Sequence, residues 1–208
     1  PHMLLTLAAI TGAVTGFAIL ALDRPLAAWL ANYQALELWN TGLDILEWAI
    51  GLPVFSWVSG IVLVLGMIVT SAVPRWRHLA PAWTWIAAVH LLARIATLQL
   101  KLATRRLRPY EWLAHADDDV ETFGWIKAHS FPSGHVTLFA SLAIPLAVIV
   151  GQRHPRFAVV LLVPALYPMA ARVVQNAHFV SDVTASITLV CVIAWATGWL
   201  VRPLRSRA

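Results

Sequence analysis

The chain has 208 residues, of which 60% are hydrophobic and only 12% are charged, with 15 Lys and Arg against 10 Asp and Glu. Soluble domains are about 25% charged, so this composition and a mean hydropathy of +0.73 indicate a membrane-embedded protein and exclude disordered, fibrous and disulfide-framework classes. Most basic residues flank apolar runs, where they act as topology signals, so no nucleic-acid partner is expected. The single cysteine, Cys191, excludes an intramolecular disulfide and a cysteine-based zinc site.

Six apolar runs can cross a bilayer, whose core of roughly 30 Å needs about 20 helical residues. The predicted spans are residues 4–22, 53–73, 79–100, 136–151, 157–171 and 183–201. Between the first two, Leu26–Trp48 is amphipathic and is predicted to form an interfacial helix that Gly51 and Pro53 end. Without an internal repeat or linker, residues 1–208 are expected to form one all-α domain, in which Pro1 and His2 are interpreted as a cloning remnant before Met3.

The distribution of Lys and Arg predicts the orientation. The loops after the second and fourth spans and the C-terminal tail carry seven basic residues, whereas the first loop carries only Arg24; the seven are Arg75, Arg77, Arg153, Arg156, Arg202, Arg205 and Arg207. Since Lys and Arg favour the cytoplasmic side, both termini are predicted to be cytoplasmic. The loop 101–135 then faces the exterior although it contains five basic residues, which suggests that those residues have a function.

The first segment with candidate functional residues is Lys101–Pro109. Lys101 and Arg108 are seven residues apart, so they are predicted to lie on one side of a helix that ends at Pro109, with Arg108 extended. Two cations at a membrane surface suit a phosphate, although a basic loop that binds anionic lipid explains this segment equally well on its own. For Arg105 and Arg106, pairing with the acidic residues 117–119 is favoured over contact with a lipid headgroup.

The second segment is Phe131–His135, directly before the fourth predicted span. Ser133 is predicted to cap the helix, Gly134 allows close approach of the backbone, and the N–H groups at the helix start can bind an anion. On their own, Ser133 and Gly134 are better explained by a capped turn without function. His135 favours the functional interpretation, because an ionisable residue that enters a membrane helix is by default functional.

The third segment is Arg172–Asp182. His178 and Asp182 are four residues apart, so the carboxylate can hold one ring nitrogen and leave the lone pair of the other available. Arg172 is six residues before His178, and the two can share a substrate only if a turn intervenes, which Gln175 and Asn176 can supply. A structural His–Asp pair is the alternative. Taken together, the three segments contain the cations, hydrogen-bond donors and two His that phosphoryl transfer requires.

In their order and spacing, the three segments resemble the signatures of the type-2 phosphatidic acid phosphatase superfamily. The resemblance implies a metal-independent lipid phosphatase without cofactor. It further implies that Lys101, Arg108 and Arg172 hold the phosphate with Ser133 and Gly134. His178 would be the nucleophile that forms a phosphohistidine, Asp182 would orient it, and His135 would be the general acid. Ala171 departs from the Ser that usually precedes the Arg in this family.

The expected function is hydrolysis of a phosphomonoester or diphosphate on a membrane lipid at the outer face of a plasma membrane, with the bilayer and the lipid as partners and no obligatory protein partner. Candidate substrates are undecaprenyl diphosphate, phosphatidylglycerol phosphate, phosphatidic acid and a lipid A phosphate. A lipid phosphotransferase with the same intermediate and a non-catalytic transporter are the alternatives. His90 and Arg94, on one face of the third span, either line a polar cavity or, for Arg94, reach the outer interface.

Overall fold

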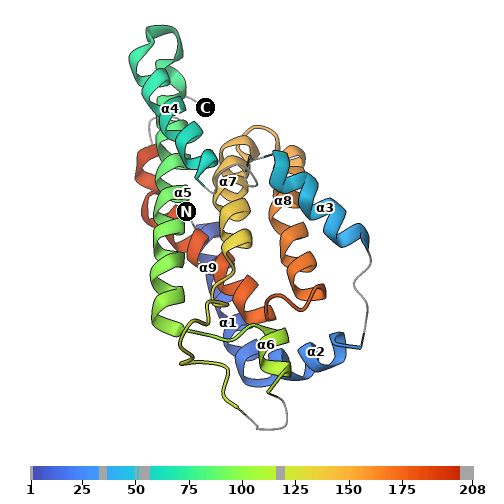
Figure 1. Ribbon diagram of the computed structural model, residues 1–208. Helices are drawn as coiled ribbons and strands as arrows, with labels where there is room; N and C mark the ends of the chain where they lie inside the picture. The colour runs from blue at the N-terminus through green and yellow to red at the C-terminus, as the bar shows by residue number, and fades with distance from the viewer. Residues whose placement is uncertain (1, 33–36, 50, 52–56, 116–119, 202–208) are drawn as a thin grey trace.

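The computed structural model describes residues 2–32, 37–49, 51, 57–115 and 120–201, and these residues form an all-α bundle, as predicted (Figure 1). The helices are α1 His2–Phe17, α2 Asp23–Leu30, α3 Glu37–Ala49, α4 Val58–Ala72, α5 Ala80–Thr104, α6 Pro109–Leu113, α7 Gly134–Gly151, α8 Pro155–Val174 and α9 Val180–Ala196. A π-helical turn, η1 Ala18–Leu22, joins α1 to α2, and short 3-10 helices precede α5 (η2, Pro74–Leu79) and follow α9 (η4, Gly198–Val201).

Four stretches of the described chain are long and apolar enough to cross a membrane, namely His2–Leu30, Pro74–Leu113, Gly134–Gly151 and Pro155–Val174. Helices α4 and α9 are apolar but shorter, with 15 and 17 residues. At 1.5 Å per residue they are about 22 and 25 Å long, somewhat less than a hydrocarbon core of roughly 30 Å. The protein is therefore an integral membrane protein with multiple helical spans, and four of the six predicted spans reach spanning length as helices.

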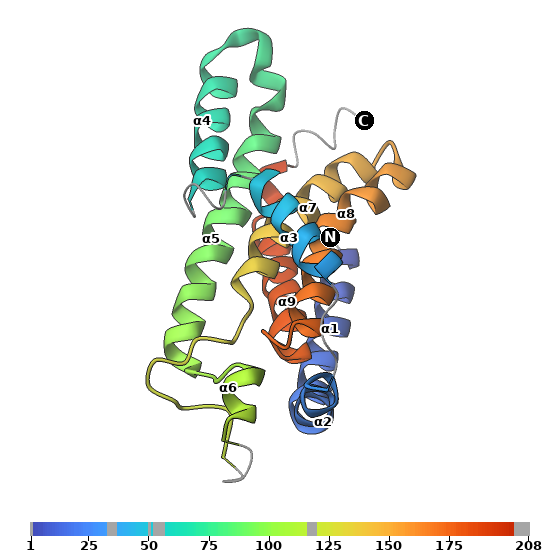
Figure 2. The same cartoon turned by 45° about the vertical axis from the view of Figure 1, so that its right-hand side comes forward.

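The prediction of a single helix over Leu26–Trp48 is wrong. The chain forms two helices here, and the first, α2, continues α1 through the π-helical turn instead of starting anew. The reason lies in Asp23, which is 2% exposed and accepts a hydrogen bond from the backbone N–H of Ser181 at 3.1 Å. This contact holds the start of α2 against the bundle. Helix α3 lies beside α8, as both views show (Figure 2).

The core of the bundle is formed where α7 and α9 pack against α1, α5 and α8. Trp85, Val89, Val136 and Val190 are fully buried within one large hydrophobic cluster. Paired hydroxyl groups also join α1 to α9, with Thr11 Oγ1 2.7 Å from Thr188 Oγ1 and a similar pair one turn further along. The polar residues of the three segments are not part of this cluster and lie at one end of the bundle.

The two ends of the bundle differ in composition. The turns between α4 and α5 and between α7 and α8 lie at one end, with Arg75, Arg77, Arg153 and Arg156, and the start of α5 packs there against the end of α9 through a hydrogen bond from Trp85 Nε1 to the Ala194 carbonyl at 3.3 Å. At the other end, the C-terminal ends of α5 and α8 meet the N-terminal ends of α7 and α9 (Figure 1). All three sequence segments lie at this second end.

The prediction of a helix that extends to Arg108 is wrong. Helix α5 ends at Thr104 because Arg105 adopts a left-handed conformation with a φ of 47°, which commonly terminates helices. The next residues are extended, and their backbone is held by bonds from Leu107 N–H to the Thr122 carbonyl at 2.8 Å and from Ser130 N–H to the Arg106 carbonyl at 2.9 Å. Lys101 and Arg108 are therefore not on one helix, although Arg108 itself is extended before Pro109, as predicted.

Candidate active site

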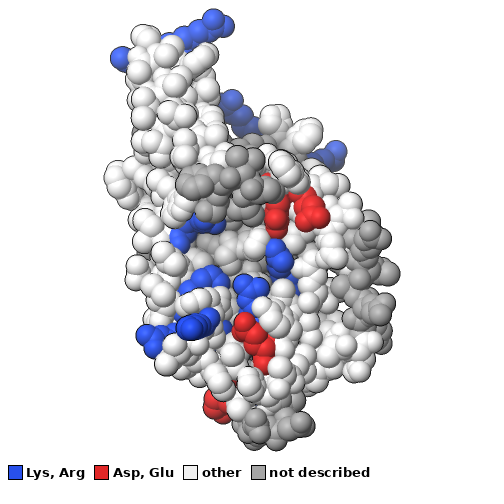
Figure 3. Space-filling model, in the orientation of Figure 1, with Lys and Arg blue, Asp and Glu red and all other residues white. Residues whose placement is uncertain are grey.

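The candidate site lies where four helix ends meet. The backbone N–H of Ser133, at the start of α7, donates to the carbonyl of Asp182 in the first turn of α9 at 3.1 Å, so these two starts are directly joined. Figure 3 shows several Lys and Arg side chains gathered near the middle of this face, with Asp and Glu side chains above and below them. The site therefore combines positive charge with helix starts, a setting suited to an anion.

His178 and Asp182 form the pair that their spacing predicts. Nδ1 of His178 lies 3.3 Å from Oδ2 of Asp182, and both side chains are buried, with 3% and 0% exposure. The same carboxylate oxygen accepts hydrogen bonds from the Ser130 hydroxyl and, at 3.0 Å, from the Phe179 backbone N–H. Since Asp182 holds the Nδ1 side of the ring, Nε2 is the nitrogen whose lone pair remains for chemistry.

The local electrostatics keep His178 neutral. Burial lowers the pKa of His178, because charging a buried imidazole is unfavourable, and the cations of Lys101 and Arg108 act in the same direction, whereas the hydrogen bond and charge of Asp182 oppose the shift. A neutral imidazole has a lone pair that can attack an electrophile. His178 therefore has the protonation state that a nucleophile requires near neutral pH.

The predicted turn before His178 is confirmed. Helix α8 ends at Val174, and Asn176 adopts a positive φ of 54°. The backbone N–H groups of Ala177 and His178 both donate to the carbonyl of Arg172, at 3.0 and 3.1 Å. This turn brings His178 back toward Arg172, so that residues from two different helices can contact one ligand.

The predicted phosphate-binding residues come from three segments. Lys101 Nζ donates to the carbonyl oxygens of His129 and Ser130, which places the ammonium group against the chain just before α7. A Cβ added to Gly134 would lie 3.8 Å from Lys101 Cε, so the side chain of Lys101 passes directly beside this glycine. Arg108, extended at the start of α6, acts electrostatically on His178 together with Lys101. The structure therefore brings the cations of the first segment to the other two segments.

Ser133 occupies the predicted cap position at the start of α7, but its hydroxyl makes no capping hydrogen bond. The residue is fully buried, and Ser133 Oγ is one of the buried polar atoms without a hydrogen-bond partner among the described residues. A buried hydroxyl without a partner is energetically unfavourable unless a ligand satisfies it. Its position beside Gly134 and Lys101 is consistent with a role in binding a phosphate oxygen.

His135 and Arg172 are joined by a residue that the sequence analysis missed, Glu47 of α3. Oε1 of Glu47 lies 3.1 Å from both Arg172 Nη2 and His135 Nε2, and Arg172 Nη2 lies 2.7 Å from His135 Nε2. Burial raises the pKa of the Glu47 carboxyl, while the neighbouring Arg172 lowers it. No local pattern marks Glu47, because its partners are far away in the sequence.

Helix α3 is held over the site by contacts with α8. A Cβ added to Gly42 would overlap the Tyr167 side chain and lie 2.5 Å from its Cζ, so only glycine allows the two helices to approach this closely. The rings of Trp39 and Tyr167 stack with their centroids 5.4 Å apart, and Gln175 Nε2 donates to Asn40 Oδ1 at 2.6 Å. These contacts fix the position from which Glu47 reaches the site.

The interpretation that Arg106 pairs with residues 117–119 is wrong. The Arg106 side chain is 1% exposed, and its two terminal nitrogens contact Asp23 Oδ2 and Asp182 Oδ1, each at 2.7 Å. The guanidinium also lies between the rings of Phe123 and Phe179, 4.5 and 4.3 Å from their centroids. Residues 117–119 lie outside the described part of the chain. Arg106 is thus the buried counter-ion of Asp182, and helix α2 supplies the second carboxylate.

His90 and Arg94, the two other residues of α5 singled out in the sequence, have different environments. His90 is fully buried, with Nδ1 2.8 Å from the Ser141 hydroxyl and Nε2 3.0 Å from the Ser59 hydroxyl, so it is part of the interior. Arg94 instead lines a cavity with Lys101 and Gly134.

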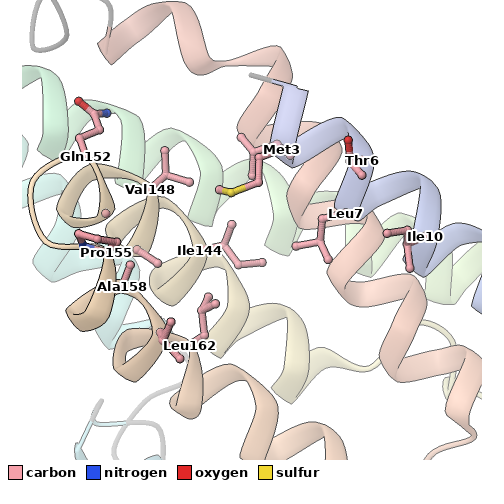
Figure 4. Close-up of a pocket in the computed structure, with 14 residues that line it drawn as sticks. Met3, Thr6, Leu7, Ile10, Ile144, Val148, Gln152, Pro155, Ala158 and Leu162 are labelled. Atoms are coloured by element: carbon pink, nitrogen blue, oxygen red, sulfur yellow. The ribbon is translucent and has the colours of Figure 1, made fainter.

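A much larger cavity of about 1010 Å³ between α1, α7 and α8 is lined by side chains such as Leu7, Ile144 and Leu162 (Figure 4). Its lining contains no titratable side chain and lies at the opposite end of the bundle.

Within the part of the chain that the structure describes, no group of three or more His, Cys, Asp or Glu side chains could hold a metal ion. The polar groups that converge are instead cations and hydrogen-bond donors around one neutral imidazole, which is the arrangement that suits a phosphoryl group.

Comparison with known proteins agrees with this chemistry. The model of the PAP2 superfamily matches residues 81–206, which include all three segments. The chain belongs to the PAP2 superfamily. The resemblance inferred from the three segments is thereby confirmed, and the protein is a PAP2-type membrane phosphatase, a hydrolase that acts on phosphate esters.

The fold is also similar to a solved structure, described as the first transmembrane PAP2 type phosphatidylglycerolphosphate phosphatase from Bacillus subtilis. The two chains are 20% identical, the match covers 95% of this chain and 91% of the other, and the TM-score is 0.55. A comparison with curated protein sequences finds no significant match. The structural similarity extends to the N-terminal helices, which lie outside the 81–206 match.

Replacement of Arg106 tests its role as counter-ion. Arg106→Gln leaves the buried carboxylates of Asp23 and Asp182 without their cation, and breaking such a pair costs about 3–5 kcal/mol. We expect a clear decrease in the melting temperature of the detergent-solubilised protein, together with loss of phosphatase activity. The matched control is Arg105→Gln, which removes an exposed cation one residue earlier and should change neither property by much. Equal melting temperatures for Arg106→Gln and the parent would contradict the assignment.

Proposed function

We propose that the protein hydrolyses the phosphomonoester or diphosphate headgroup of a membrane lipid through a phosphohistidine intermediate, without a metal ion. The observation that carries this proposal is the buried His178, held by Asp182 at Nδ1 and acted on by the cations Lys101 and Arg108 of the first segment. The relative from Bacillus subtilis is described as acting on phosphatidylglycerolphosphate, which makes this lipid one candidate substrate. Undecaprenyl diphosphate, phosphatidic acid and lipid A phosphates are the others.

The first step is attack of His178 Nε2 on phosphorus. A nitrogen–phosphorus bond forms while the bond from phosphorus to the leaving oxygen breaks, and the proton of protonated His135 goes to that oxygen. In the second step a water molecule gives its proton to His135 and attacks phosphorus, which releases inorganic phosphate and restores His178. The three cations, the Ser133 hydroxyl and the start of α7 at Gly134 stabilise the charge on the remaining phosphoryl oxygens.

Glu47 has a defined role in these two reaction steps. An Arg side chain can only donate, so with Arg172 Nη2 2.7 Å away, His135 Nε2 acts as an acceptor in the structure. When a phosphate takes the donors of Arg172, Nε2 can carry the proton that a general acid needs, and the Glu47 carboxylate at 3.1 Å can accept its hydrogen bond. Glu47 therefore acts as a positioning residue that stabilises protonated His135.

The topology proposed for this function has six spans in one domain. Four are the long apolar stretches, and the shorter helices α4 and α9 are the other two. The end of the bundle with Arg75, Arg77, Arg153 and Arg156 is placed in the cytoplasm, and the candidate site at the outer surface of the plasma membrane. Both the start of α1 and the end of α9 lie on the basic side, so this arrangement has cytoplasmic termini. It is supported by the position of the basic turns at the end opposite the site (Figure 1).

The phosphohistidine is tested by removal of the nucleophile. His178→Ala should reduce phosphate release to background for every lipid in a panel of the four candidate substrates. Rapid denaturation at alkaline pH, where the nitrogen–phosphorus bond of a phosphohistidine is stable, should trap labelled phosphoenzyme from the parent but not from the variant. Asp182→Asn preserves the shape but favours the wrong tautomer, so we expect a loss of several orders of magnitude in kcat. Activity of the parent should survive EDTA. A folded His178→Ala protein that turns over at the parent rate would refute the mechanism.

The pH dependence separates the two His. The lowered pKa of His178 keeps it neutral to lower pH, so the acid limb of the kcat/KM profile should have its midpoint below about 6.5, the usual value for His. Glu47→Gln removes a charge that favours protonated His135, so the alkaline limb should move to lower pH by about one unit while the acid limb stays. Glu121→Gln, which removes a largely exposed carboxylate that pairs with Arg24, is the control and should leave both limbs in place. An unchanged alkaline limb in Glu47→Gln would exclude this role.

Cysteine labelling in intact cells tests the orientation. Ile126 is 79% exposed near the site, and His154 is exposed in the turn between α7 and α8. With a membrane-impermeant reagent, Ile126→Cys should be labelled and His154→Cys should be labelled only after the membrane is opened. The native Cys191 is buried and gives little background. The reverse pattern would place the site in the cytoplasm.

A further inference from the structure

A further cation, Arg94, adjoins the proposed phosphate site from within the membrane. A cavity of about 260 Å³ is lined by Trp57, Arg94, Thr97, Leu98, Lys101 and Gly134. Lys101 and Gly134 belong to the proposed phosphate site, so the cavity opens directly beside it. Arg94 is not part of any of the three segments and has no role in the reaction as derived above.

Arg94 and Lys101 are on the same face of one continuous helix. Both lie within α5, which is helical from Ala80 to Thr104, and seven residues correspond to almost two full turns. At 1.5 Å per residue their Cα atoms are about 10 Å apart along the helix axis. Since both side chains line the same cavity, one elongated ligand can contact both cations.

The environment of Arg94 fits ligand binding. A charged residue within a membrane span is costly and is by default functional. The guanidinium lies over the ring of Trp57, 5.0 Å from its centroid. Stacking of this kind uses the face of the planar guanidinium, whereas a phosphate is recognised by the N–H groups in its plane.

The direction of α5 indicates which part of a lipid reaches Arg94. The helix runs from the basic end of the bundle to the candidate site, so Arg94 lies deeper in the bundle than Lys101. Leu98, between the two cations, is 52% exposed and lines the same cavity, which therefore has an apolar border. A lipid whose terminal phosphate lies at Lys101 would extend past Arg94 with the part of its headgroup that is closer to the hydrocarbon chain.

We propose that Arg94, stacked on Trp57, forms a second anion subsite that binds the chain-proximal phosphate of a lipid with two phosphates. This inference rests on the proposed function, because it assumes that the terminal phosphate occupies the site of Lys101 and His178. The subsite makes a lipid with two phosphates, either as a diphosphate or as a terminal monoester beyond a phosphodiester, the preferred substrate class. A lipid with a single phosphate has no group for Arg94.

The experiment compares Arg94→Gln with the parent on phosphatidic acid, which has one phosphate, and on phosphatidylglycerol phosphate and a polyprenyl diphosphate, which have two. Loss of a charge-assisted hydrogen bond should raise KM for the two-phosphate lipids roughly 10- to 100-fold, and phosphatidic acid should be hydrolysed as by the parent. Arg105→Gln, which removes an exposed cation beyond the end of α5, should leave all three substrates unaffected. An equal effect of Arg94→Gln on both classes, or none on either, would overturn the subsite.

Binding without turnover distinguishes this inference from the proposed function. In a His178→Ala background, a two-phosphate lipid should raise the melting temperature more than phosphatidic acid does, and Arg94→Gln should abolish this difference. If the difference persists in the double variant, the subsite is wrong. If His178→Ala retains full turnover but the difference depends on Arg94, the mechanism fails and the subsite stands.

Discussion

The buried charge of Asp182 determines much of the architecture around the site. A carboxylate with 0% exposure must have its charge and lone pairs satisfied by protein groups, because no water is available to it. Its oxygens contact Arg106, the Ser130 hydroxyl, the Phe179 N–H and His178, while its backbone carbonyl receives the N–H of Ser133. One residue thus connects the loop after α5, the segment before α7 and the start of α9. The precise placement of His178 follows from these contacts.

This arrangement also explains how a neutral nucleophile and several cations can coexist in a small volume. Arg106 pairs with both Asp23 and Asp182, and the remaining negative charge of Asp182 also acts on Lys101. Lys101 and Arg108 act on His178 as neighbouring cations and favour its neutral form, whereas the charge of Asp182 opposes them. Glu47 offsets only Arg172, on the side of His135. Asp23 and Asp182 are thus paired with Arg106, and Glu47 with Arg172, while Lys101 and Arg108 act on His178.

The sequence predicted those parts of the fold and site that depend on neighbouring residues. The all-α membrane class, the His178–Asp182 spacing and the turn at Asn176 are local properties, and each is found in the structure. The roles of Arg106 and Glu47 could not be predicted, because Arg106 pairs with Asp23 from 83 residues earlier and Glu47 contacts Arg172 from 125 residues away. The helical continuation to Arg108 was wrong for a related reason, since backbone bonds to Thr122 and from Ser130 override the local helical pattern.

Asp23 and Glu47 have a consequence for how the site can vary in evolution and design. Both residues precede the 81–206 match, yet each directly contacts a member of the signature segments or its counter-ion. The N-terminal helices are held in place by features of their own, such as the threonine pairs between α1 and α9 and the close approach of Gly42 to Tyr167. A chimaera that joins the last 128 residues to first helices without these two carboxylates would therefore retain every signature residue and still have a differently charged site.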